Sequence, residues 1–323
     1  IDFIKNMSDI FFEELNIPKP DYNLGISGGN HGSMTGRMME SLEEVMLKEK
    51  PDVLLVYGDT NSTLAASLAA VKLHIPICHV EAGNRLGTLN NPEEVNRICT
   101  DHVSTKLLAC TESAMNFLAK EGLLEKAELV GDPMYDAFLY YGRNITEEQK
   151  NAIKHVDGYP VKRPDEFYYL TCHRQENTDT DEKLTEILKA MNSLDAPTIY
   201  PVHPRNKDRA TAICSSNQFN NIILTNPVGY LTSISLVNDA KKIVTDSDGL
   251  QREAFFAEKK CVTVFDCVIW PETMVDGRNV LSTPSFNDII NKLELPQNIS
   301  KSYLPFGNGN SGEKIVDILL NIK

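Results

Sequence analysis

Acidic and histidine side chains recur directly after short apolar runs of this sequence. Asp59, Glu81 and His173 each follow such a run, and His203 and Asp246 follow two more. Ligands of open parallel sheets bind beyond the carboxyl ends of the strands. Any one of these residues is more often structural than catalytic, because polar residues at such positions also cap helices. Found together at several strand ends, they favour a functional site.

Residues 244–254 indicate a phosphate site. An apolar strand runs into the turn Ser247-Asp-Gly249 and then into a helix. The start of that helix offers unpaired backbone N–H groups and the positive end of the helix dipole, which suit a diphosphate. Glu253, further along the helix, could accept a hydrogen bond from a sugar or ribose hydroxyl. The alternative is that Ser247 only caps the helix, and this segment alone does not decide between the two.

Three carboxylates have the placement expected of acid–base catalysts. Asp59 and Glu81 follow strands, and Glu93 lies near the start of a helix. If the three converge, burial and mutual repulsion would move their pKa values apart, so that one can act as an acid and another as a base. The alternative is that Glu93 or Glu94 forms a salt bridge or a cap at the helix start. The sequence alone does not show convergence.

Alternating strands and helices must position these residues. In the first part of the chain we expect strands at residues 53–57, 75–80, 106–110 and 128–130. We expect helices at residues 1–15, from Thr35, at 61–73 and from Glu112, with methionines such as Met46 filling the core. The strands are apolar throughout rather than alternating, which is typical of a parallel sheet covered on both faces.

The same rhythm restarts after a polar, proline-containing stretch at residues 143–164. Beyond it we expect strands at residues 167–171, 198–201, 222–225, 242–245 and 261–265, and a last amphipathic helix at 313–322. The predicted fold class is α/β, with two Rossmann-like, doubly wound lobes and a cleft between them. We expect residues 1–142 to form the N-terminal lobe, with a helix at 311–323 packing back on it. Residues 143–310 would form the C-terminal lobe.

The composition argues against several classes of protein. A net charge of −13 is unfavourable for general nucleic-acid binding, although a phosphate ligand needs only local donors. No apolar stretch approaches the roughly 20 residues needed to cross a bilayer, and the opening residues do not resemble a secretory leader. We therefore expect a soluble, cytoplasmic protein with no membrane or nucleic-acid partner. The 7 cysteines form no C-x-x-C pair and the 7 histidines show no metal-ligand spacing, so we expect reduced thiols and no metal.

Six motifs, in one order along the chain, carry a resemblance to a known family. They are Tyr57-Gly-Asp-Thr-Asn-Ser-Thr63, His79-Val-Glu-Ala-Gly83, Pro92-Glu-Glu-Val-Asn-Arg97, His173-Arg-Gln-Glu-Asn177, Tyr200-Pro-Val-His203 and Thr245-Asp-Ser-Asp-Gly-Leu-Gln-Arg-Glu253. Together they resemble the non-hydrolysing UDP-N-acetylglucosamine 2-epimerases, over essentially the whole chain. The resemblance implies the two-lobed fold of the GT-B glycosyltransferases, with UDP bound by the C-terminal lobe.

The resemblance implies an isomerase that inverts C2 of a UDP-N-acetylhexosamine without a cofactor. UDP would be eliminated in the anti sense, giving an enzyme-bound 2-acetamidoglucal, and re-added with a proton delivered to the opposite face. By position, the catalytic residues are Asp59, Glu81, Glu93 and His173. The positions that fall to substrate or UDP binding are Arg85, Arg97, Arg174, His203, Ser247, Asp248, Gly249 and Glu253. The resemblance also implies a homodimer that serves the synthesis of cell-surface polysaccharide precursors.

The sequence departs from the family pattern at three places. The turn Asn84-Arg-Leu-Gly87 keeps only the arginine of the usual pattern. Asp248 stands where a second glycine is common, and its carboxylate should weaken diphosphate binding unless it points away. The loop Phe265-Asp-Cys-Val-Ile-Trp-Pro-Glu272 is short and lacks the usual arginine and paired threonines. Its Trp-Pro-Glu sequence is compatible with relatives that act on other UDP-acetamidosugars, so the substrate stays open.

The largest departure concerns the beginning of the family pattern. Family members open with a strand and a Gly-Thr-Arg-Pro-Glu turn that supplies cationic groups to the nucleotide, and the present sequence has no such segment. We therefore expect an incomplete first lobe with an unpaired edge at residues 53–57 or at a neighbouring strand. We also expect poor turnover, and either a tendency to aggregate or a mobile first lobe. Two other functions stay open: a GT-B glycosyltransferase, which would need an acceptor site, and a UDP-sugar-binding protein with little activity.

Overall fold

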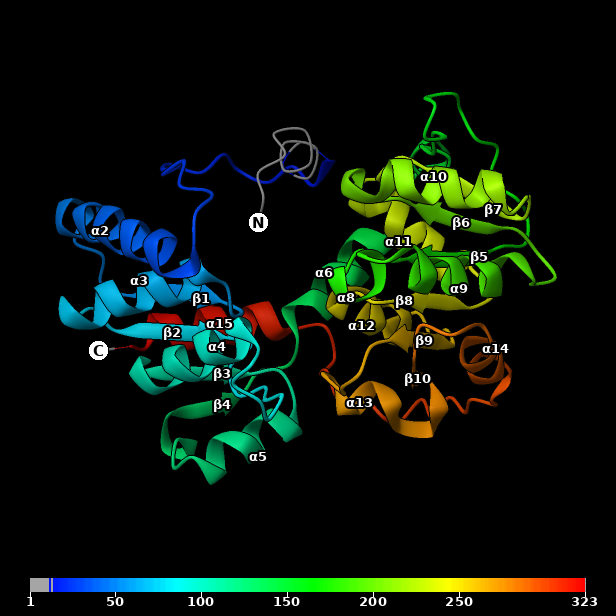
Figure 1. The fold of residues 1–323 in the computed structure, drawn as a ribbon. Coiled ribbons are helices and arrows are strands. Elements are labelled where there is room, and N and C mark those ends of the chain that lie inside the picture. The colour runs from blue at the N-terminus through cyan, green and yellow to red at the C-terminus, as the bar shows by residue number, and fades with distance from the viewer. Residues whose placement is uncertain (1–11, 13, 323) are drawn as a thin grey trace. The chain divides into compact units, whose positions relative to one another are not determined.

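The computed structural model describes Phe12 and residues 14–322, so most of the helix predicted at residues 1–15 lies outside the described residues. The chain divides into two compact units (Figure 1). The main segments of unit 1 are Ile17–Ala137 and Tyr303–Lys323, and unit 2 contains Glu13–Asn16 and Phe138–Ser302. The segment from Tyr303 therefore returns to the unit that holds Ile17–Ala137.

Unit 1 is built on a 4-stranded parallel sheet in the order β1-β2-β3-β4. Its strands are β1 (Leu54–Tyr57), β2 (Ile77–Val80), β3 (Lys106–Ala109) and β4 (Ala127–Leu129). The helices of the unit are α2 (His31–Glu49), α3 (Asn61–Lys72), α4 (Pro92–Val103), α5 (Glu112–Lys120) and α15 (Ser311–Leu320). α6 (Pro133–Gly142) begins in unit 1 and ends in unit 2.

Small and apolar side chains pack the helices of unit 1 onto its sheet. Ala66, Ala69 and Ala70 of α3 form a buried cluster with Met46 of α2 and with strand residues. Met46 is therefore core filler, as predicted. In a second buried cluster of this unit, Ile315 of α15 packs among side chains of the strands. The red helix of Figure 1 therefore contributes to the core of this unit.

Helix α2 begins earlier than predicted. We expected a start at Thr35, but the helix begins at His31, directly after Asn30 in an extended conformation. The glycines that bend the preceding loop are Gly25, Gly28 and Gly29, all with positive φ. Because the loop already ends there, Gly32 lies inside the helix, where its side-chain-free backbone is tolerated rather than required.

Strand β1 forms one edge of the unit 1 sheet. Within the part of the chain that the structure describes, its only partner strand is β2. The strand is correspondingly less buried than β2: Tyr57 is 57% exposed, whereas all four residues of β2 are buried. The unpaired edge that we expected at residues 53–57 is therefore present among the described residues.

Unit 2 is built on a 6-stranded parallel sheet in the order β10-β9-β8-β5-β6-β7. The strands are β5 (Tyr168–Thr171), β6 (Thr198–Pro201), β7 (Ile222–Thr225), β8 (Ile243–Thr245), β9 (Cys261–Val264) and β10 (Asn279–Ser282). Five of them match the predicted strands. β10 was not predicted, because its sequence Asn-Val-Leu-Ser is short, begins and ends on polar residues, and lies at the edge of the sheet.

Two apolar clusters cover the two faces of the unit 2 sheet. One contains Leu170, Val244 and Val262 with helix residues, and the other contains Tyr169, Ile243 and helix residues of the opposite face. The helices are α7 (Glu147–Lys150), α8 (Gln175–Thr178), α9 (Asp181–Asn192), α10 (Lys207–Ser216), α11 (Tyr230–Asp239), α12 (Asp248–Phe256), α13 (Pro271–Met274) and α14 (Phe286–Glu294). The predicted α/β class with parallel, Rossmann-like sheets is confirmed.

The strand order of unit 2 reverses between β5 and β8. From β5 the chain proceeds outward through β6 and β7, and then returns to the other side of β5 with β8, β9 and β10. Ligands of doubly wound sheets bind at such a switch point, beyond the carboxyl ends of the two adjacent strands. Those ends are Thr171 and Thr245, which pair in register. The residues that follow them are therefore where a ligand site is expected.

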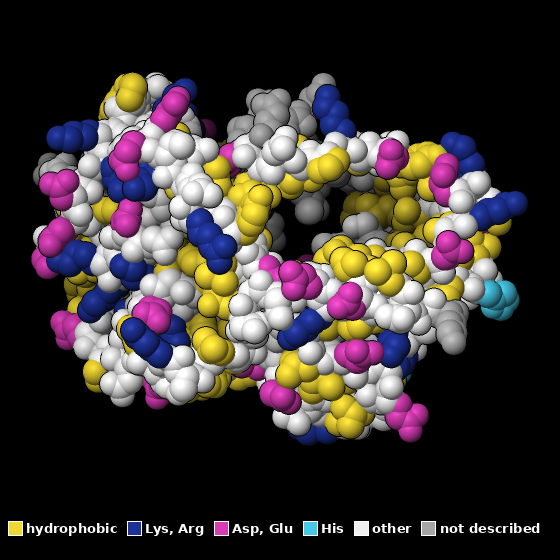
Figure 2. All heavy atoms as spheres, turned by 180° about the vertical axis from the view of Figure 1, so that it is seen from behind, with side chains coloured by type: hydrophobic (Ala, Val, Ile, Leu, Met, Phe, Trp, Pro, Cys, Tyr) yellow, Lys and Arg dark blue, Asp and Glu magenta, His cyan; other side chains and the backbone are white. Residues whose placement is uncertain are grey.

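Helix length and surface charge bear on the expected partners. None of the helices in the described residues is long and apolar enough to cross a membrane. Figure 2 shows acidic and basic side chains interspersed over the described surface in view, without a continuous basic patch. This agrees with the net charge of −13, which is unfavourable for general nucleic-acid binding.

Candidate functional site

Asp246 organises the switch point of unit 2. It follows β8, and its fully buried carboxylate accepts hydrogen bonds from the backbone N–H groups of His173 at 2.9 Å and Arg174 at 2.9 Å. Asn177 Nδ2 adds a third at 3.2 Å. A side chain after β8 thus fixes the loop that follows β5. The sequence placed Asp246 at a strand end but gave it no role.

His173 is oriented by the same carboxylate. Its Nδ1 lies 3.0 Å from Asp246 Oδ1, and its side chain is 47% exposed. The carboxylate favours a proton on Nδ1, which leaves Nε2 to face a ligand. Burial alone would raise the pKa of Asp246, but the hydrogen bond and charge of His173, with the N–H of Arg174, hold it below its ordinary value. Asp246 therefore stays ionised and keeps the imidazole in place.

Two arginines and a second histidine line the same region. Arg174 Nε donates to the carbonyl of Asp246 at 2.7 Å, and its guanidinium lies 4.1 Å from the ring centroid of Phe265. Arg205 Nη2 donates to the carbonyl of His173 at 2.6 Å, and the N–H of Arg205 donates to His203 Nδ1 at 3.2 Å. The predicted residues Arg174 and His203 are thus both tied to the loops around the switch point.

The start of α12 is where the sequence predicts a phosphate site. Ser247 caps the helix, since its hydroxyl accepts a hydrogen bond from the N–H of Leu250 at 3.3 Å. Among the described residues, no acceptor engages the N–H groups of Asp248 and Gly249, and residues 247–249 are partly exposed. The capping interpretation of Ser247 is therefore correct for its hydroxyl, while two N–H donors at the positive end of the dipole remain available to an anion.

The carboxylate of Asp248 is turned to a tryptophan. The indole Nε1–H of Trp270 donates a hydrogen bond to Asp248 Oδ1, and Trp270 is fully buried. From the resemblance, a glycine is common at this position, and a carboxylate here was expected to weaken diphosphate binding unless it points away. In the structure, one of its oxygens is engaged by the loop before α13.

Glu253 is a buried carboxyl group on α12. It is 5% exposed, and burial raises its pKa to about 7, although a hydrogen bond from Tyr230 and the nearby charge of Arg252 oppose the shift. A carboxyl group with this pKa exists in both protonation states near neutrality. It can therefore gain a full charge when a ligand donates a hydroxyl hydrogen bond to it.

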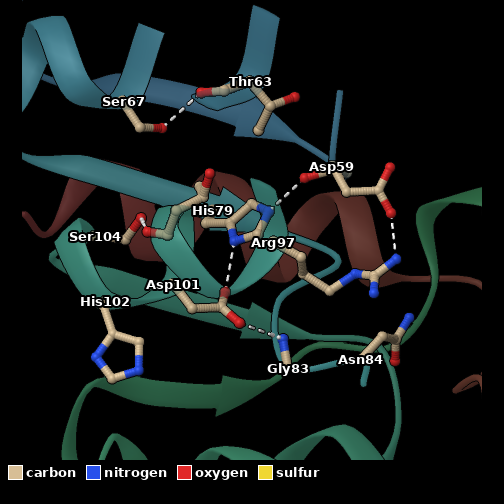
Figure 3. A network of polar contacts seen from close by, with 12 residues as sticks. Asp59, Thr63, Ser67, His79, Gly83, Asn84, Arg97, Asp101, His102 and Ser104 are labelled. Carbon is tan, nitrogen blue, oxygen red and sulfur yellow. Dashed lines mark hydrogen bonds and ion pairs between the residues drawn. The ribbon is translucent and has the colours of Figure 1, made fainter. Parts of the chain in front are cut away.

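In unit 1, Asp59 is held by an arginine on α4. Asp59 lies in the turn after β1, and its Oδ2 forms an ion pair with Arg97 Nη2 (Figure 3). Arg97 is 4% exposed and also binds Glu94 Oε2 through Nη1 at 2.6 Å. Asn96 Nδ2 donates to the Asp59 carbonyl at 2.9 Å. Two neighbouring residues of α4 thus fix the position of Asp59.

Glu81 follows β2 in a strained backbone conformation. Its φ is 69°, in the left-handed region that residues with a side chain rarely adopt. The N–H groups of Glu81 and Ala82 both donate to the carbonyl of Leu108 on the neighbouring strand, at 3.1 Å and 3.3 Å. Strained backbone of this kind clusters at functional sites, where it fixes the direction of a side chain.

Glu93 and Glu94 have opposite environments at the start of α4. Asn91 caps this helix by accepting from both of their N–H groups, at 2.8 Å and 3.2 Å. Glu94 is 1% exposed, and its carboxylate accepts from the N–H groups of Leu86 and Gly87 in addition to the bond from Arg97. Glu93 is exposed. The salt-bridge alternative is therefore realised by Glu94, and Glu93 remains the accessible carboxylate.

A buried network behind Asp59 was not predicted from the sequence. His79 on β2 lies 2.7 Å from Asp101 Oδ1 through Nδ1 and 2.7 Å from the Gly58 carbonyl through Nε2 (Figure 3). Both ring nitrogens therefore face oxygen atoms of the protein. Asp101 Oδ2 accepts from the Gly83 N–H at 3.1 Å. The network joins the turns that carry Asp59 and Glu81, and its sequence signal is a histidine inside an otherwise apolar strand.

The two remaining arginines predicted to bind UDP in unit 1 lie in ion pairs. Arg85 Nη1 is 2.8 Å from Asp101 Oδ2, and Arg85 Nε is 2.7 Å from Glu121 Oε1. Arg97 is engaged by Asp59 and Glu94, as described above. Contact of either arginine with the nucleotide stays a prediction. In this structure both serve to hold carboxylates.

Comparisons with known proteins agree with the motifs. Residues 2–320 match the family model described as UDP-N-acetylglucosamine 2-epimerase. The chain is 44% identical over 320 residues to a UDP-N-acetylglucosamine 2-epimerase homolog of Methanococcus maripaludis, covering 98% of this chain and 88% of the relative. It is 42% identical to the UDP-2,3-diacetamido-2,3-dideoxy-D-glucuronate 2-epimerase of Pseudomonas aeruginosa, covering 99% and 89%.

A solved structure shares the fold over nearly the whole chain. It is the UDP-GlcNAc 2-epimerase of Methanocaldococcus jannaschii in complex with UDP-GlcNAc and UDP, with a TM-score of 0.85 and 40% identity. The similarity covers 98% of this chain and 89% of that one. The family match, the relatives and the fold lead to one conclusion. The chain belongs to the UDP-N-acetylglucosamine 2-epimerase family of isomerases, as its motifs predict.

Proposed function

We propose that this chain inverts the configuration at C2 of a UDP-N-acetylhexosamine by eliminating UDP and adding it back. In the forward step a base removes the C2 proton while the C1–O bond to UDP breaks, which leaves a C1–C2 double bond. In the return step an oxygen of UDP attacks C1, and an acid delivers a proton to the opposite face of C2. The reaction is redox-neutral, so it needs no redox cofactor.

The observation that carries this proposal is the arrangement at the switch point of unit 2. His173 and Asp246 follow adjacent strands and are joined at 3.0 Å, beside a helix start with two available N–H groups. Backbone donors and a histidine are suited to the negative charge of a leaving diphosphate. We therefore assign the UDP of the substrate to this region, with Glu253 as the acceptor for a hydroxyl.

We assign the proton transfers to acids of unit 1. Asp59, Glu81 and Glu93 stand in the turns after β1 and β2 and at the start of α4, where side chains face the carboxyl ends of the strands. Asp59 is paired with Arg97, which fixes the direction of its carboxylate as a positioned base requires. Glu93 is exposed, so its carboxylate is accessible to a ligand. The strained backbone of Glu81 supports a positioned third group.

The finer properties belong to the same proposal. UDP-GlcNAc and UDP-ManNAc are the substrate pair that we favour, and the Pseudomonas aeruginosa relative supports a related UDP-acetamidosugar as the alternative. We place the reaction in the cytoplasm, where a homodimer would supply precursors of cell-surface polysaccharides. The membership of the family is the support for each of these statements.

Deuterium exchange tests the reaction. The chain is incubated with UDP-GlcNAc in D₂O, and the recovered UDP-sugars are examined by NMR. Deuterium at C2 in both epimers is expected, because each turnover exchanges that proton with an acid of the protein. Turnover of the UDP-sugar without deuterium at C2 would contradict the proposal, and transfer of the sugar to an acceptor would support a glycosyltransferase.

Calorimetry with UDP tests the assigned region. The double variant Ser247→Ala with Glu253→Ala is expected to bind UDP more weakly, because it alters the cap of α12 and removes the hydroxyl acceptor. A matched double variant on the surface of the same unit, Ser215→Ala with Glu182→Ala, should bind as the wild type does. Unchanged affinity in the first variant would place the nucleotide elsewhere.

A further inference from the structure

Asp248 occupies a position where a free carboxylate would compete with a diphosphate. It is the first residue of α12, so its side chain lies beside the N–H groups of residues 248 and 249. A negative group at the first turn of a helix is attracted by the positive end of the helix dipole. An unrestrained carboxylate would therefore occupy the donors that a phosphate needs and would repel the phosphate as well.

In the structure this carboxylate is held by Trp270. The indole N–H donates to Asp248 Oδ1, a hydrogen bond strengthened by the charge of the acceptor. The donor comes from the loop that follows β9 and precedes α13, so it approaches the aspartate from outside its own helix. The bond draws one carboxylate oxygen toward that loop.

Trp270 is itself firmly placed. It is fully buried, and its carbonyl accepts from the N–H of Thr273 at 3.0 Å and from the Thr273 hydroxyl at 2.8 Å. The guanidinium of Arg252 lies 4.1 Å from the centroid of the indole ring. Because Arg252 is four residues after Asp248, both side chains project from one face of α12 toward the same tryptophan. The indole is a fixed donor rather than a mobile one.

We propose that Trp270 is a positioning residue that holds the Asp248 carboxylate away from the start of α12, and so keeps the helix N–H groups available to a nucleoside diphosphate. The proposal rests on the assignment of UDP to this region made above. It explains how the chain tolerates an acidic residue in its phosphate turn. It also makes the short 265–272 loop, through Trp270, a determinant of nucleotide affinity.

A double-mutant cycle on UDP affinity tests the proposal. Trp270→Phe keeps an aromatic ring but removes the N–H, and we expect UDP to bind about tenfold more weakly, which is about 1.4 kcal/mol. Asp248→Asn in the wild-type background should change the affinity by less than about threefold, because the charge is already held away. Adding Asp248→Asn to Trp270→Phe should restore the affinity to within about threefold of wild type. A purely structural effect of losing the indole would not be rescued by neutralising Asp248.

Tyr168→Phe is the matched control. It also removes an aromatic donor from an aspartate of unit 2, since Tyr168 Oη donates to Asp195 Oδ1 at 2.8 Å, and it should leave UDP affinity unchanged. Equal losses in Trp270→Phe and in the double variant would overturn the proposal. If Trp270→Phe does not fold, Asp248→Asn alone still decides, because a gain of tenfold or more would mean that the carboxylate already opposes UDP.

The proposed UDP site is tested separately by Ser247→Ala with Glu253→Ala. If that double variant binds UDP normally, the site assignment fails. If it weakens binding while the cycle shows no coupling between positions 248 and 270, only the role of Trp270 fails.

Discussion

The two units hold buried carboxylates in different ways. In unit 1, Asp101 lies 2.7 Å from His79 Nδ1 and 2.8 Å from Arg85 Nη1. In unit 2, Glu253 is similarly buried, and it accepts a hydrogen bond from the neutral hydroxyl of Tyr230. The first carboxylate is surrounded by cationic or protonatable partners, whereas the second has only a weaker influence from the charge of Arg252.

The pKa values follow from this difference. Burial alone would raise the pKa of Asp101, but His79 and Arg85 together hold it below its ordinary value. Burial raises the pKa of Glu253 to about 7, because its partners compensate too little. Unit 1 therefore contains a buried carboxylate whose pKa is lowered, behind the turns that carry Asp59 and Glu81. Unit 2 contains a carboxyl group whose charge can respond to a ligand.

Breaking the unit 1 network should have the largest effect. Asp101→Asn removes the buried carboxylate that contacts His79 and leaves Arg85 with Glu121 as its only acidic partner among the described residues. Breaking such a buried pair costs about 3–5 kcal/mol of unfolding free energy. The measurement is chemical denaturation, monitored with a probe that reports on the unfolding of unit 1. Because the pKa of Asp101 is lowered, its contribution is present above the ordinary pKa of 3.8 and is lost as pH falls further. The difference between the proteins should persist at pH 5 and shrink only in stronger acid.

Asp52→Asn is the control for this variant. Asp52 is exposed in the same unit, so the same chemical change should alter stability by less than about 0.5 kcal/mol. Equal stabilities of Asp101→Asn and Asp52→Asn would mean that the buried network adds nothing, and the contrast between the units would then lose its basis.

The adjacent glutamates of α4 sharpen the comparison within unit 1. Glu93→Gln should lower the rate of epimerisation by at least about a hundredfold, the usual effect of losing a general acid or base, with little change in stability. Glu94→Gln should instead lower stability, because Glu94 accepts two N–H groups and pairs with Arg97. Both are measured by initial rates and by denaturation of the purified variants.

Asp59→Asn and Glu81→Gln complete this series, with the same expected loss of rate. The rates are measured under conditions in which the wild-type protein is active. Normal turnover in all three variants would remove Asp59, Glu81 and Glu93 from the mechanism. A loss of rate in Glu94→Gln without a loss of stability would transfer the catalytic role to the buried residue.

Much of the fold was predictable because its strands are short, apolar and separated by helices. The sequence located the strands of unit 1 and five strands of unit 2 to within two residues at either end. The sequence-based prediction failed where the pattern of apolar residues does not define an element or its boundary. β10 has only two apolar residues, and the start of α2 depends on the conformations of glycines that composition does not reveal.

The sequence predicted which residues form the candidate site, but it did not predict which partners they contact. Strand ends and helix starts identified Asp59, Glu81, Glu93 and Ser247, since these positions follow from local pattern. The partners Asp101, Asp246 and Trp270 depend on contacts between segments 22 to 73 residues apart, and local patterns do not contain such contacts. The difference between Glu93 and Glu94 is likewise set by the direction in which each side chain leaves the helix.

Binding of UDP should release a proton from Glu253, the carboxyl group of unit 2 whose charge can change. If UDP donates a hydroxyl hydrogen bond to Glu253, binding favours the ionised form and displaces a proton. With a pKa of about 7 in the free protein, UDP affinity should rise by about tenfold between pH 6 and pH 8 and then level off. Calorimetry in buffers of different ionisation enthalpy measures the released proton directly.

Glu253→Gln is the control, since it cannot ionise. The titration of UDP itself is common to both proteins and cancels in the comparison. The UDP affinity of the variant should lack the tenfold rise between pH 6 and pH 8 that is expected of the wild type. Identical profiles would show that Glu253 does not change its charge on binding, and the two units would then not differ in the way proposed.

The smallest effect is expected at an exposed ion pair of unit 1. Lys106 Nζ lies 2.7 Å from Glu128 Oε1, a distance equal to that between Asp101 and His79, but the two side chains are 34% and 44% exposed. Solvent screens such pairs, so Glu128→Gln should lower the unfolding free energy by less than about 1 kcal/mol, and 1 M salt should remove most of the difference. The unfolding free energies of both proteins are measured by chemical denaturation at low and at high salt. If Glu128→Gln proved as damaging as Asp101→Asn, contact distance rather than burial would set the strength of these pairs. The buried network would then have no special role in holding the turns that carry Asp59 and Glu81.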